Sequence, residues 1–288
     1  MSERAVEVDV GHLSLRGEKD SLIDYILRVW DVRSFMFHEA RTHVSSRGEH
    51  QALGNLWLII NPIMDGAVFY IVFGLILQMD KGIPNFIAFL LVGVFCFQMT
   101  TRCVNGSSMS IYRWRTSSST SSLPAIAAPI NENLRTWIAG LPSYLVLVVM
   151  ILALPPLENL SPIAFLVVPV IVLQIGINLG ISLIAAHFIA RVPDLNNILR
   201  VSTRAWMFGS GVMFPVAKFA ELGPVFAFII HWNPMAWVLN HIREVFVYNE
   251  LPSIEGWLIM ILWAVVPLLA GTVLIWRGES SHRSVGDE

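Results

Sequence analysis

The sequence has few charged residues, since Asp, Glu, Lys and Arg make up only 14% of its 288 residues. A soluble domain usually carries about 25% charged residues, so this deficit excludes an ordinary cytosolic enzyme. Cysteine is also scarce, because the two cysteines, Cys96 and Cys103, are too few for a disulfide-rich scaffold. Since 55% of the residues are hydrophobic, a disordered chain is excluded as well. The composition is that of a membrane protein.

Motifs for nucleotide hydrolysis and metal binding are missing too. A P-loop ends in Gly-Lys-Ser/Thr, and none of Lys19, Lys81 and Lys218 follows a glycine. The nearest pattern to a zinc-binding helix begins at His38, but Thr42 stands where a second histidine is needed. The sequence therefore predicts no catalytic residue, no metal site and no cofactor on this chain.

Several apolar stretches are long enough to cross a membrane core, which takes about 20 residues of helix. The six candidates are residues 56–79, 84–104, 134–154, 163–190, 195–215 and 254–276. Arg200 and Arg204 interrupt the fifth of them. Before the last span, residues 224–248 are apolar but broken at Asn233 and Pro234, which favours a re-entrant hairpin on the outer side.

The distribution of Lys and Arg predicts the orientation, because cytoplasmic loops carry an excess of these residues. With the N-terminus inside, all but three of the 19 Lys and Arg residues fall on the cytoplasmic side, and the exceptions are Lys81, Lys218 and Arg243. We therefore predict an all-α membrane protein with six transmembrane helices and both termini in the cytoplasm. Its parts are a cytoplasmic N-terminal segment at 1–54, the six-helix domain at 55–277 and a cytoplasmic tail at 278–288.

An amphipathic helix is predicted before the first span, at about residues 20–37. Ile23, Ile26, Leu27 and Trp30 recur at the spacing of one helix face, while charged residues take the opposite face. This pattern predicts a helix that lies in the plane of the cytoplasmic headgroups. The alternative is a helix that packs on a soluble partner.

Polar residues inside a predicted span are candidates for function, because burying them in lipid is costly. Asp65 is either a proton- or ion-coupling site or a carboxylate near the interface, capped by Asn61 or paired with an arginine. Arg200 and Arg204 lie one helical turn apart. They either reach back to membrane phosphates or bind the anionic headgroup of a substrate, such as a lipid pyrophosphate.

Two further predictions concern helix packing. Gly176 and Gly180 form a small-xxx-small face in the fourth span, which permits close approach of another helix. Cys96 and Cys103 are seven residues apart on one predicted helix. That spacing is roughly 10 Å along the axis, too far for a disulfide, so we expect both to be small apolar fillers.

Aromatic residues are abundant, with 10 Trp, 16 Phe and 5 Tyr. Many belong to the belts at the two membrane interfaces, but flat aromatic faces also hold sugars without fixing them, as a sliding polymer requires. For each residue, packing is the alternative. The candidates for a sugar-conducting path lie on the first and fifth spans: Phe69, Tyr70, Phe73, Trp206, Phe208 and Phe214.

Three short motifs follow one another in a familiar order. The entry to the first span, residues 47–62, carries basic residues, then Leu-Gly-x-Leu-Trp, then Pro. Arg191-Val-Pro-Asp194 precedes the fifth span, and Trp-Asn-Pro-Met at 232–235 lies in the predicted hairpin. Over about residues 41–276 the chain resembles the ABC-2 type permeases, particularly exporters of O-antigen, capsule, teichoic acid and galactan. The spacing before Asp194 and the two arginines of the fifth span depart from the family pattern.

The resemblance implies a permease subunit that exports a lipid-linked polysaccharide, such as galactan, O-antigen or a teichoic acid, across the bacterial cytoplasmic membrane. It implies a homodimer on two copies of a separate ATPase subunit, which holds ATP and Mg, and no nucleic-acid partner. The first and fifth spans then face the central path. The ATPase contacts are the N-terminal helix, here 22–37, and the second cytoplasmic loop, here 111–129. The loop residues assigned to this contact are Tyr112, Arg113, Trp114, Arg115, Pro124 and Pro129.

Two alternatives to polysaccharide export stay open on the sequence. A drug or small-lipid exporter of the same superfamily would respond to amphiphilic drugs rather than to lipid-linked glycan. A secondary carrier would transport without ATP and would depend on Asp65.

Overall fold

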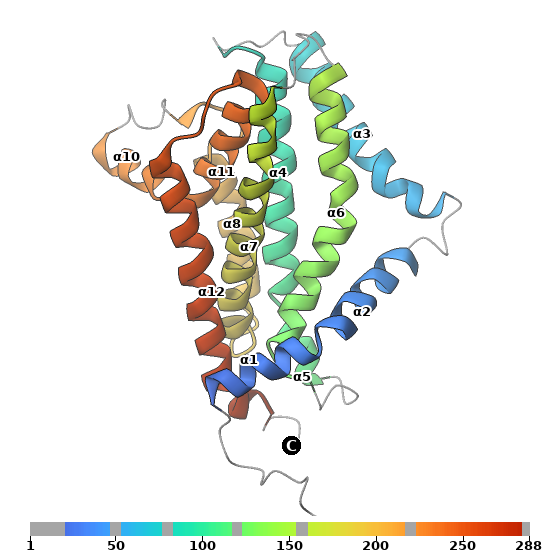
Figure 1. Cartoon of the computed structure of the whole chain (residues 1–288), viewed down its shortest axis with the longest axis vertical. Coiled ribbons are helices and arrows are strands. Elements are labelled where there is room, and N and C mark those ends of the chain that lie inside the picture. Colours follow the sequence, from blue (N-terminus) through green and yellow to red (C-terminus); the bar gives the residue numbers. More distant parts are fainter. Residues whose placement is uncertain are drawn as a thin grey trace, which may run out of the picture.

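Long helices run side by side along the longest axis of the molecule, and short helices lie at both ends (Figure 1). The computed structural model describes residues 21–46, 53–76, 83–116, 123–153, 161–216 and 223–283, and this part of the chain contains no strand. The lower end of the bundle carries α1 (Leu22–Asp31) and α5 (Ser110–Thr116), and the upper end carries α10 (Pro224–His231). The predicted all-α fold is confirmed.

Among the described residues, five helical segments are long and apolar enough to cross a membrane, and they overlap five of the six predicted spans. They are built from α3 (Trp57–Phe69) with the π-helical turn Tyr70–Ile76, α4 (Phe86–Ser107), α6 (Ala127–Ala153), α7 (Val167–Ile189) and α12 (Ile254–Arg283). The other predicted span begins with α8 (Leu195–Gly209), whose 15 residues extend only about 22 Å. The count of six therefore stays a prediction.

The central helix of the bundle is α4. In its most apolar stretch 78% of the residues are buried, whereas only 11% are buried in the stretch that contains α3. Leu90 and Phe97 of α4 form the main core with Val238 and Leu239 of α11 (Pro234–Arg243). By contrast, α3 lies at the edge and leans away from the bundle toward its lower end (Figure 1).

The most extensive contact between two described helices joins α7 and α12, and glycines permit their close approach. A Cβ atom on Gly180 would lie 2.7 Å from the backbone nitrogen of Leu268, and one on Gly176 would lie 3.0 Å from Cβ of Ala264. Gly271 of α12 meets Leu183 of α7 in the same way. The prediction that the small residues of the fourth span permit close helix approach is confirmed.

The predicted amphipathic helix is divided into two helices, α1 and α2 (Arg33–Ser46), rather than running unbroken over 20–37. The break follows from a side chain that caps α1: Arg33 Nη1 donates a hydrogen bond to the carbonyl of Trp30 at 2.8 Å. Beyond the break, α2 packs against α6. One continuous face of α2 is therefore covered, through the buried residues Met36, Ala40 and Val44.

The apolar face of α1 points away from the bundle, since Ile23, Ile26, Leu27 and Trp30 are all exposed. Tyr25 on the other face is buried in a small apolar cluster at the lower end. Burial and the neighbouring Glu279 carboxylate raise the pKa of the Tyr25 phenol, so the hydroxyl stays neutral. Tyr25 thus anchors α1 to the bundle and leaves its hydrophobic face free.

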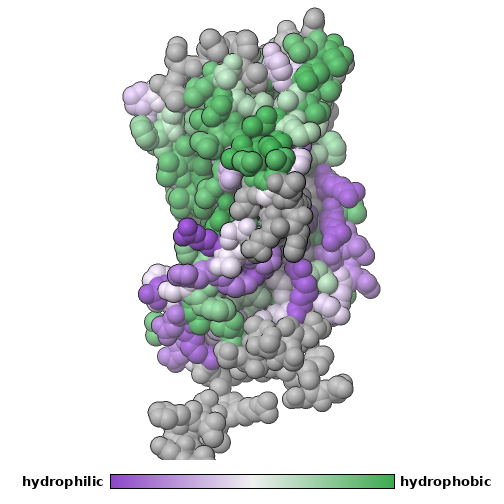
Figure 2. Space-filling model, turned by 90° about the vertical axis from the view of Figure 1, so that its right-hand side faces the viewer, coloured by the Kyte–Doolittle hydropathy of each residue, from purple (hydrophilic) through white to green (hydrophobic). Residues whose placement is uncertain are grey.

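Apolar and polar side chains are separated along the long axis of the molecule. Figure 2 looks onto the side where α2 and α3 lie in Figure 1 and shows apolar side chains over the upper part and polar ones over the lower part. An apolar band above a polar end is what a membrane protein presents to lipid and to water.

The segment before the last span forms two short helices, α10 and α11, as the interruption at Asn233 predicted. Gly223, whose φ is +136°, turns the chain into Pro224 at the start of α10. Of the two, α10 exposes most of its side chains, whereas α11 is buried against α4, α7 and α12.

Candidate functional site

A cleft of about 750 Å³ opens between α3, α4, α6 and α8. Its walls are unusually polar for helices of such apolar composition. The charged residues that line it are Arg102 of α4, Glu132 of α6, and Arg200 and Arg204 of α8. The uncharged polar residues that line it are Asn61, Thr101, Asn105, Thr136, Ser143 and Thr203.

The charges of the cleft favour an anion. Three guanidinium groups and one carboxylate line it, which leaves a formal net charge of +2. Arg200 and Arg204 are exposed and lie one turn apart on α8, and Arg102 of α4 lines the same cleft. Arg102 is oriented by a hydrogen bond from Nη2 to Gln98 Oε1 at 3.2 Å. Guanidinium groups pair in bidentate fashion with phosphate oxygens, so this arrangement suits a phosphate-bearing ligand.

The wall formed by α8 is attached at its lower end through polar side chains. Asn105 Nδ2 donates a hydrogen bond to Thr203 Oγ1 at 3.2 Å. Ser108 Oγ donates one to Asn196 Oδ1 at 2.8 Å. These two bonds join the end of α4 to the start of α8 and hold Arg200 at the cleft.

At its upper end, α8 is held by Asn233, the residue that also begins α11. Asn233 Oδ1 accepts hydrogen bonds from Trp206 Nε1 at 2.9 Å and from the backbone N–H of Met235 at 3.1 Å. Its Nδ2 donates to the carbonyl of Gly209 at 3.0 Å. The Asn-Pro motif found in the sequence is thus a helix cap that also fixes the end of α8, with Pro234 at the first helical position.

Arg243 was counted among the outer charges from the sequence, but the structure buries it to 1% exposure. Its guanidinium donates to the carbonyls of Phe89 at 3.0 and 3.2 Å, Gly211 at 2.9 Å and Val212 at 3.1 Å. The group also lies 3.4 Å over the ring of Phe89. Gly93 leaves room for it, since a Cβ there would lie 2.7 Å from Arg243 Nη2. Arg243 therefore ties α4, α11 and the turn after α8 together.

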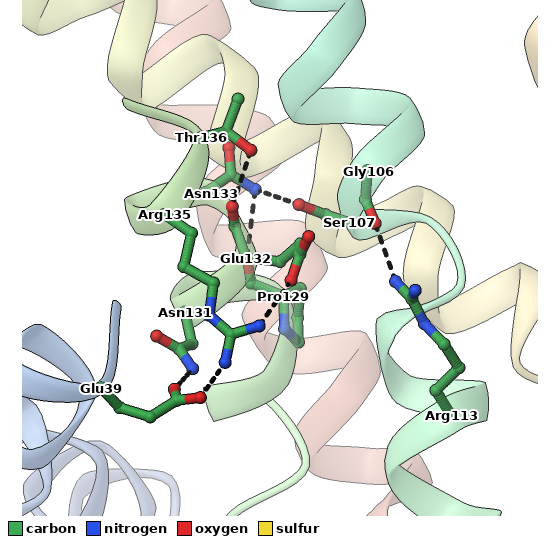
Figure 3. A network of polar contacts seen from close by, with 10 residues as sticks. All are labelled: Glu39, Gly106, Ser107, Arg113, Pro129, Asn131, Glu132, Asn133, Arg135 and Thr136. Carbon is green, nitrogen blue, oxygen red and sulfur yellow. Dashed lines mark hydrogen bonds and ion pairs between the residues drawn. The ribbon is translucent and has the colours of Figure 1, made fainter. Parts of the chain in front are cut away.

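A polar network joins α2 to the cleft (Figure 3). Arg135 of α6 forms ion pairs with Glu39 of α2 and, at 3.3 Å, with Glu132, which lines the cleft. Asn131 Nδ2 also donates to Glu39. Asn133 joins the same region to α4 by a hydrogen bond from Nδ2 to Ser107 Oγ at 2.7 Å. Neither Glu39 nor Glu132 was a candidate from the sequence, because acids on different helices give no spacing signal.

The predicted ATPase-contact residues lie at the lower end. Tyr112 is exposed, and Arg113 Nη2 donates a hydrogen bond to the carbonyl of Gly106 at 3.2 Å (Figure 3). Trp114 turns inward and packs on the apolar cluster around Tyr25. Pro124 and Pro129 are buried, and the side chain of Arg115 lies outside the described part of the structure. Of the predicted aromatic and basic knob, the structure exposes Tyr112 and Arg113.

The predicted sugar-path aromatics lie on α3 with the π-helical turn after it and on α8 with the turn after it, and their role stays a prediction. Phe69 and Phe73 stack on each other with ring centroids 6.1 Å apart, and both pack on the main core. Trp206 meets Phe97 edge-on at 5.5 Å. The remaining candidates are half-buried Tyr70 and the exposed Phe208 and Phe214. The cleft instead has Trp57 among its lining residues, which the sequence analysis used only as part of a motif.

The structure also places the acidic candidate Asp65 and the two cysteines. Asp65 is exposed on α3 and lines a small cavity beside the cleft with Gln98 and Arg102. Among the described residues, no group of three or more His, Cys, Asp and Glu side chains is arranged to hold a metal ion. Cys96 and Cys103 are buried and unbridged, which confirms the interpretation of both as fillers.

The fold is that of a helical membrane protein with a cleft lined by three arginines, and comparison with known families assigns its class. Residues 41–247 match the family model described as ABC-2 type transporter, so the chain belongs to that family. The resemblance found in the sequence is confirmed.

Relatives within this class share a name. The chain is 24% identical over 271 residues to the "O-antigen export system permease protein RfbA" of Myxococcus xanthus, and the match covers 93% of this chain and 98% of the relative. It is 22% identical over 206 residues to a protein of the same name from Klebsiella pneumoniae, over 71% of this chain and 77% of the relative. The chain is thus an ABC-2 permease similar to O-antigen export permeases.

Proposed function

We propose that this chain is the permease subunit of an ATP-driven exporter that moves a lipid-linked polysaccharide across the bacterial cytoplasmic membrane. Membership of the ABC-2 family and similarity to permeases named for O-antigen export support this proposal. The single observation that carries it is the cleft lined by Arg102, Arg200 and Arg204. Lipid-linked sugars carry their charge on phosphate groups, which these guanidinium groups are suited to bind.

The surroundings of the cleft fit a substrate with a lipid tail. The two flanking helices expose apolar side chains, Ile59 and Ile63 on α3 and Ile198 and Val201 on α8. A lipid tail can therefore stay in the bilayer against these faces while its headgroup enters the polar cleft. The net charge of +2 on the cleft balances the two charges of a diphosphate diester.

In the proposed topology, α8 and the turn after it form the fifth of six spans, and both termini are cytoplasmic. The cleft then lies on the cytoplasmic side, where a newly made lipid-linked glycan waits. The exposed apolar face of α1 rests on the inner leaflet, and α10 and α11 form the outer re-entrant hairpin.

In this proposal, a partner ATPase subunit supplies the energy for export. We assign a homodimer of this chain to two ATPase subunits, which bind ATP and Mg. Tyr112 of α5 and the helices α1 and α2 lie at the lower end, where such subunits would dock. Closure of the ATPase pair on ATP then pushes α5 and α2, and the helices around the cleft move apart to pass the glycan between protomers.

The test uses the permease purified with its ATPase subunit and reconstituted in liposomes. A short lipid-linked glycan should stimulate ATP hydrolysis. Arg200→Ala with Arg204→Ala should lower the apparent affinity at least about tenfold, since each charge-assisted hydrogen bond contributes roughly 1.5–3 kcal/mol. Arg277→Ala, which removes an exposed arginine of α12 outside the cleft, is the matched control.

Three results would contradict the proposal. Stimulation by amphiphilic drugs and not by the glycan would indicate a drug or small-lipid exporter. Transport without ATP that is lost in Asp65→Asn would indicate a secondary carrier. Labelling of Tyr112→Cys from the outer side, in a background without Cys96 and Cys103, would invert the topology.

A further inference from the structure

One guanidinium group is shared by two acids that belong to different parts of the molecule. Arg135 contacts Glu39 on α2 through Nη2 and Glu132 on its own helix through Nη1 (Figure 3). The side chains are only partly exposed, at 21% for Arg135, 34% for Glu39 and 23% for Glu132. Partial burial reduces screening by solvent, so each acid affects how strongly Arg135 holds the other.

Glu132 belongs to this network and to the cleft at once. It lines the same cleft as Arg102, Arg200 and Arg204, where its negative charge opposes the binding of an anion. When Arg135 compensates Glu132, that opposition weakens, and the three arginines of the cleft act together. The division of the Arg135 guanidinium between Glu39 and Glu132 therefore affects how strongly the cleft attracts an anion.

Glu39 moves with α2. It is adjacent in sequence to Ala40, which is fully buried where α2 packs on α6, and Asn131 Nδ2 holds its carboxylate in place. At its other end, α2 continues through Val32 into α1, whose apolar face is exposed. A force on α1 or α2 is thus transmitted to Glu39, although neither helix lines the cleft.

We propose that Glu39 is a positioning residue that sets the anion affinity of the cleft through Arg135 and Glu132. When α2 is docked, the Arg135 guanidinium is shared with Glu39 and neutralises Glu132 only in part. The remaining negative charge of Glu132 keeps the affinity of the cleft for anions low. With α2 displaced, Arg135 compensates Glu132 alone, and the cleft binds a lipid diphosphate more tightly. This inference rests on the proposed function, because it assumes that the cleft binds an anionic headgroup.

Anion binding in the cleft and docking of α2 are thermodynamically linked in this proposal. If displacement of α2 strengthens anion binding, then anion binding must loosen α2 by the same factor. Amide hydrogens of α2 should therefore exchange faster when the cleft is occupied. A merely structural role for Glu39 predicts no such response to a ligand that does not touch α2.

The experiment measures binding of farnesyl diphosphate to the full-length permease in complex with its ATPase subunit, in detergent, by tryptophan fluorescence. Glu39→Gln should raise the affinity at least about fivefold, the lower end of coupling between linked sites. Glu132→Gln should raise it too, and the double variant should bind no more tightly than Glu132→Gln alone. Asp31→Asn is the matched control, because it removes an exposed acid from α1 and should leave the affinity unchanged.

A second variant tests the same inference in case Glu39→Gln does not fold. Asn131→Ala removes the donor that holds Glu39 and changes no charge, so it should raise the affinity in the same direction by a smaller factor. Hydrogen exchange of α2 should quicken on addition of farnesyl diphosphate in the unaltered chain and not in Glu132→Gln.

The outcomes separate the two proposals. If Arg200→Ala with Arg204→Ala abolishes binding but neither Glu39→Gln nor Asn131→Ala changes it, the inference is wrong and the proposed function stands. Equal effects of Glu39→Gln and Asp31→Asn would also overturn the inference, because they would show a general charge effect. If the unaltered chain binds no farnesyl diphosphate, the headgroup site itself is wrong.

Discussion

The two sides of the bundle are held together by different forces. Around α4, α7, α11 and α12, helices approach through glycines and buried apolar side chains, and polar groups such as Arg243 are fully enclosed. On the side of α2, α3, α6 and α8, apolar contacts such as those of Met36 and Ala40 are joined by polar ones near a cleft, where Arg135 of α6 pairs with Glu39 of α2 and α8 is held to the end of α4 by hydrogen bonds. Dense packing resists displacement, whereas hydrogen bonds at a wet rim can exchange with water. The first side is therefore the fixed frame, and the second is the part that can move.

The largest expected loss of stability comes from replacing Arg243 in the fixed frame. Arg243→Met removes four hydrogen bonds and leaves the carbonyls of Gly211 and Val212 buried without their donor. We expect the free energy of unfolding to fall by about 3 kcal/mol. Denaturation in detergent, followed by tryptophan fluorescence, measures the loss. Arg277→Met, an exposed position, is the control, and an equal loss at both positions would show that burial of Arg243 is unimportant.

A smaller effect is expected from a single methyl group between α7 and α12. Gly180→Ala places Cβ 2.7 Å from the nitrogen of Leu268, so the two helices must separate. The free energy of unfolding should fall by about 2 kcal/mol, as in other overpacked cores. Gly209→Ala adds the same methyl group where no atom lies within 4 Å and should be neutral. Equal unfolding midpoints for the two variants would refute the close approach.

The junction between frame and cleft wall should respond less. Asn233→Ala removes the cap of α11 and the bond to the end of α8. A lost helix cap costs about 1 kcal/mol, so we expect a decrease of that size in the free energy of unfolding. Proteolysis should also become faster between α8 and α10. Glu250→Ala at an exposed turn serves for comparison, and unchanged proteolysis in Asn233→Ala would show that α8 does not depend on this residue.

The smallest effect is expected on the outer surface of the cleft wall. Phe208 is 57% exposed on α8, so Phe208→Ala should change the free energy of unfolding by no more than about 0.5 kcal/mol. The measurement is the same denaturation curve in detergent. A loss as large as that of Gly180→Ala would mean that this face is covered, and the contrast between the two sides would then be weaker than described.

Local patterns in the sequence predicted the features that depend on neighbouring residues. Hydropathy located five helical spans, and glycines four apart at Gly176 and Gly180 indicated close packing. Prediction was poorer at α8, whose arginines interrupt the apolar run, and at Arg33, whose side chain ends α1 earlier than the amphipathic pattern suggested. In both cases charged side chains outweigh the average hydrophobicity of their segment.

The candidate site was predicted only in part. Arg200 and Arg204 were recognised as a possible headgroup site because they are one turn apart on a single helix, and both line the cleft. Arg102 and Glu132 were missed as site residues, since nothing in their own segments distinguishes them from other surface charges. The aromatic path was predicted from residue type alone and stays a prediction, and the structure adds that Trp206 also packs edge-on against Phe97.

The sequence by itself determined that this is a helical membrane protein of the ABC-2 family, because hydrophobicity and short motifs are read along one dimension. Only the tertiary structure decided which charged residues line the same cleft. The cleft combines residues from Trp57 to Arg204 on four helices, and the acid that acts on it from outside, Glu39, comes from a fifth. Electrostatic interactions depend on distance through space, and the distance along the chain does not report it.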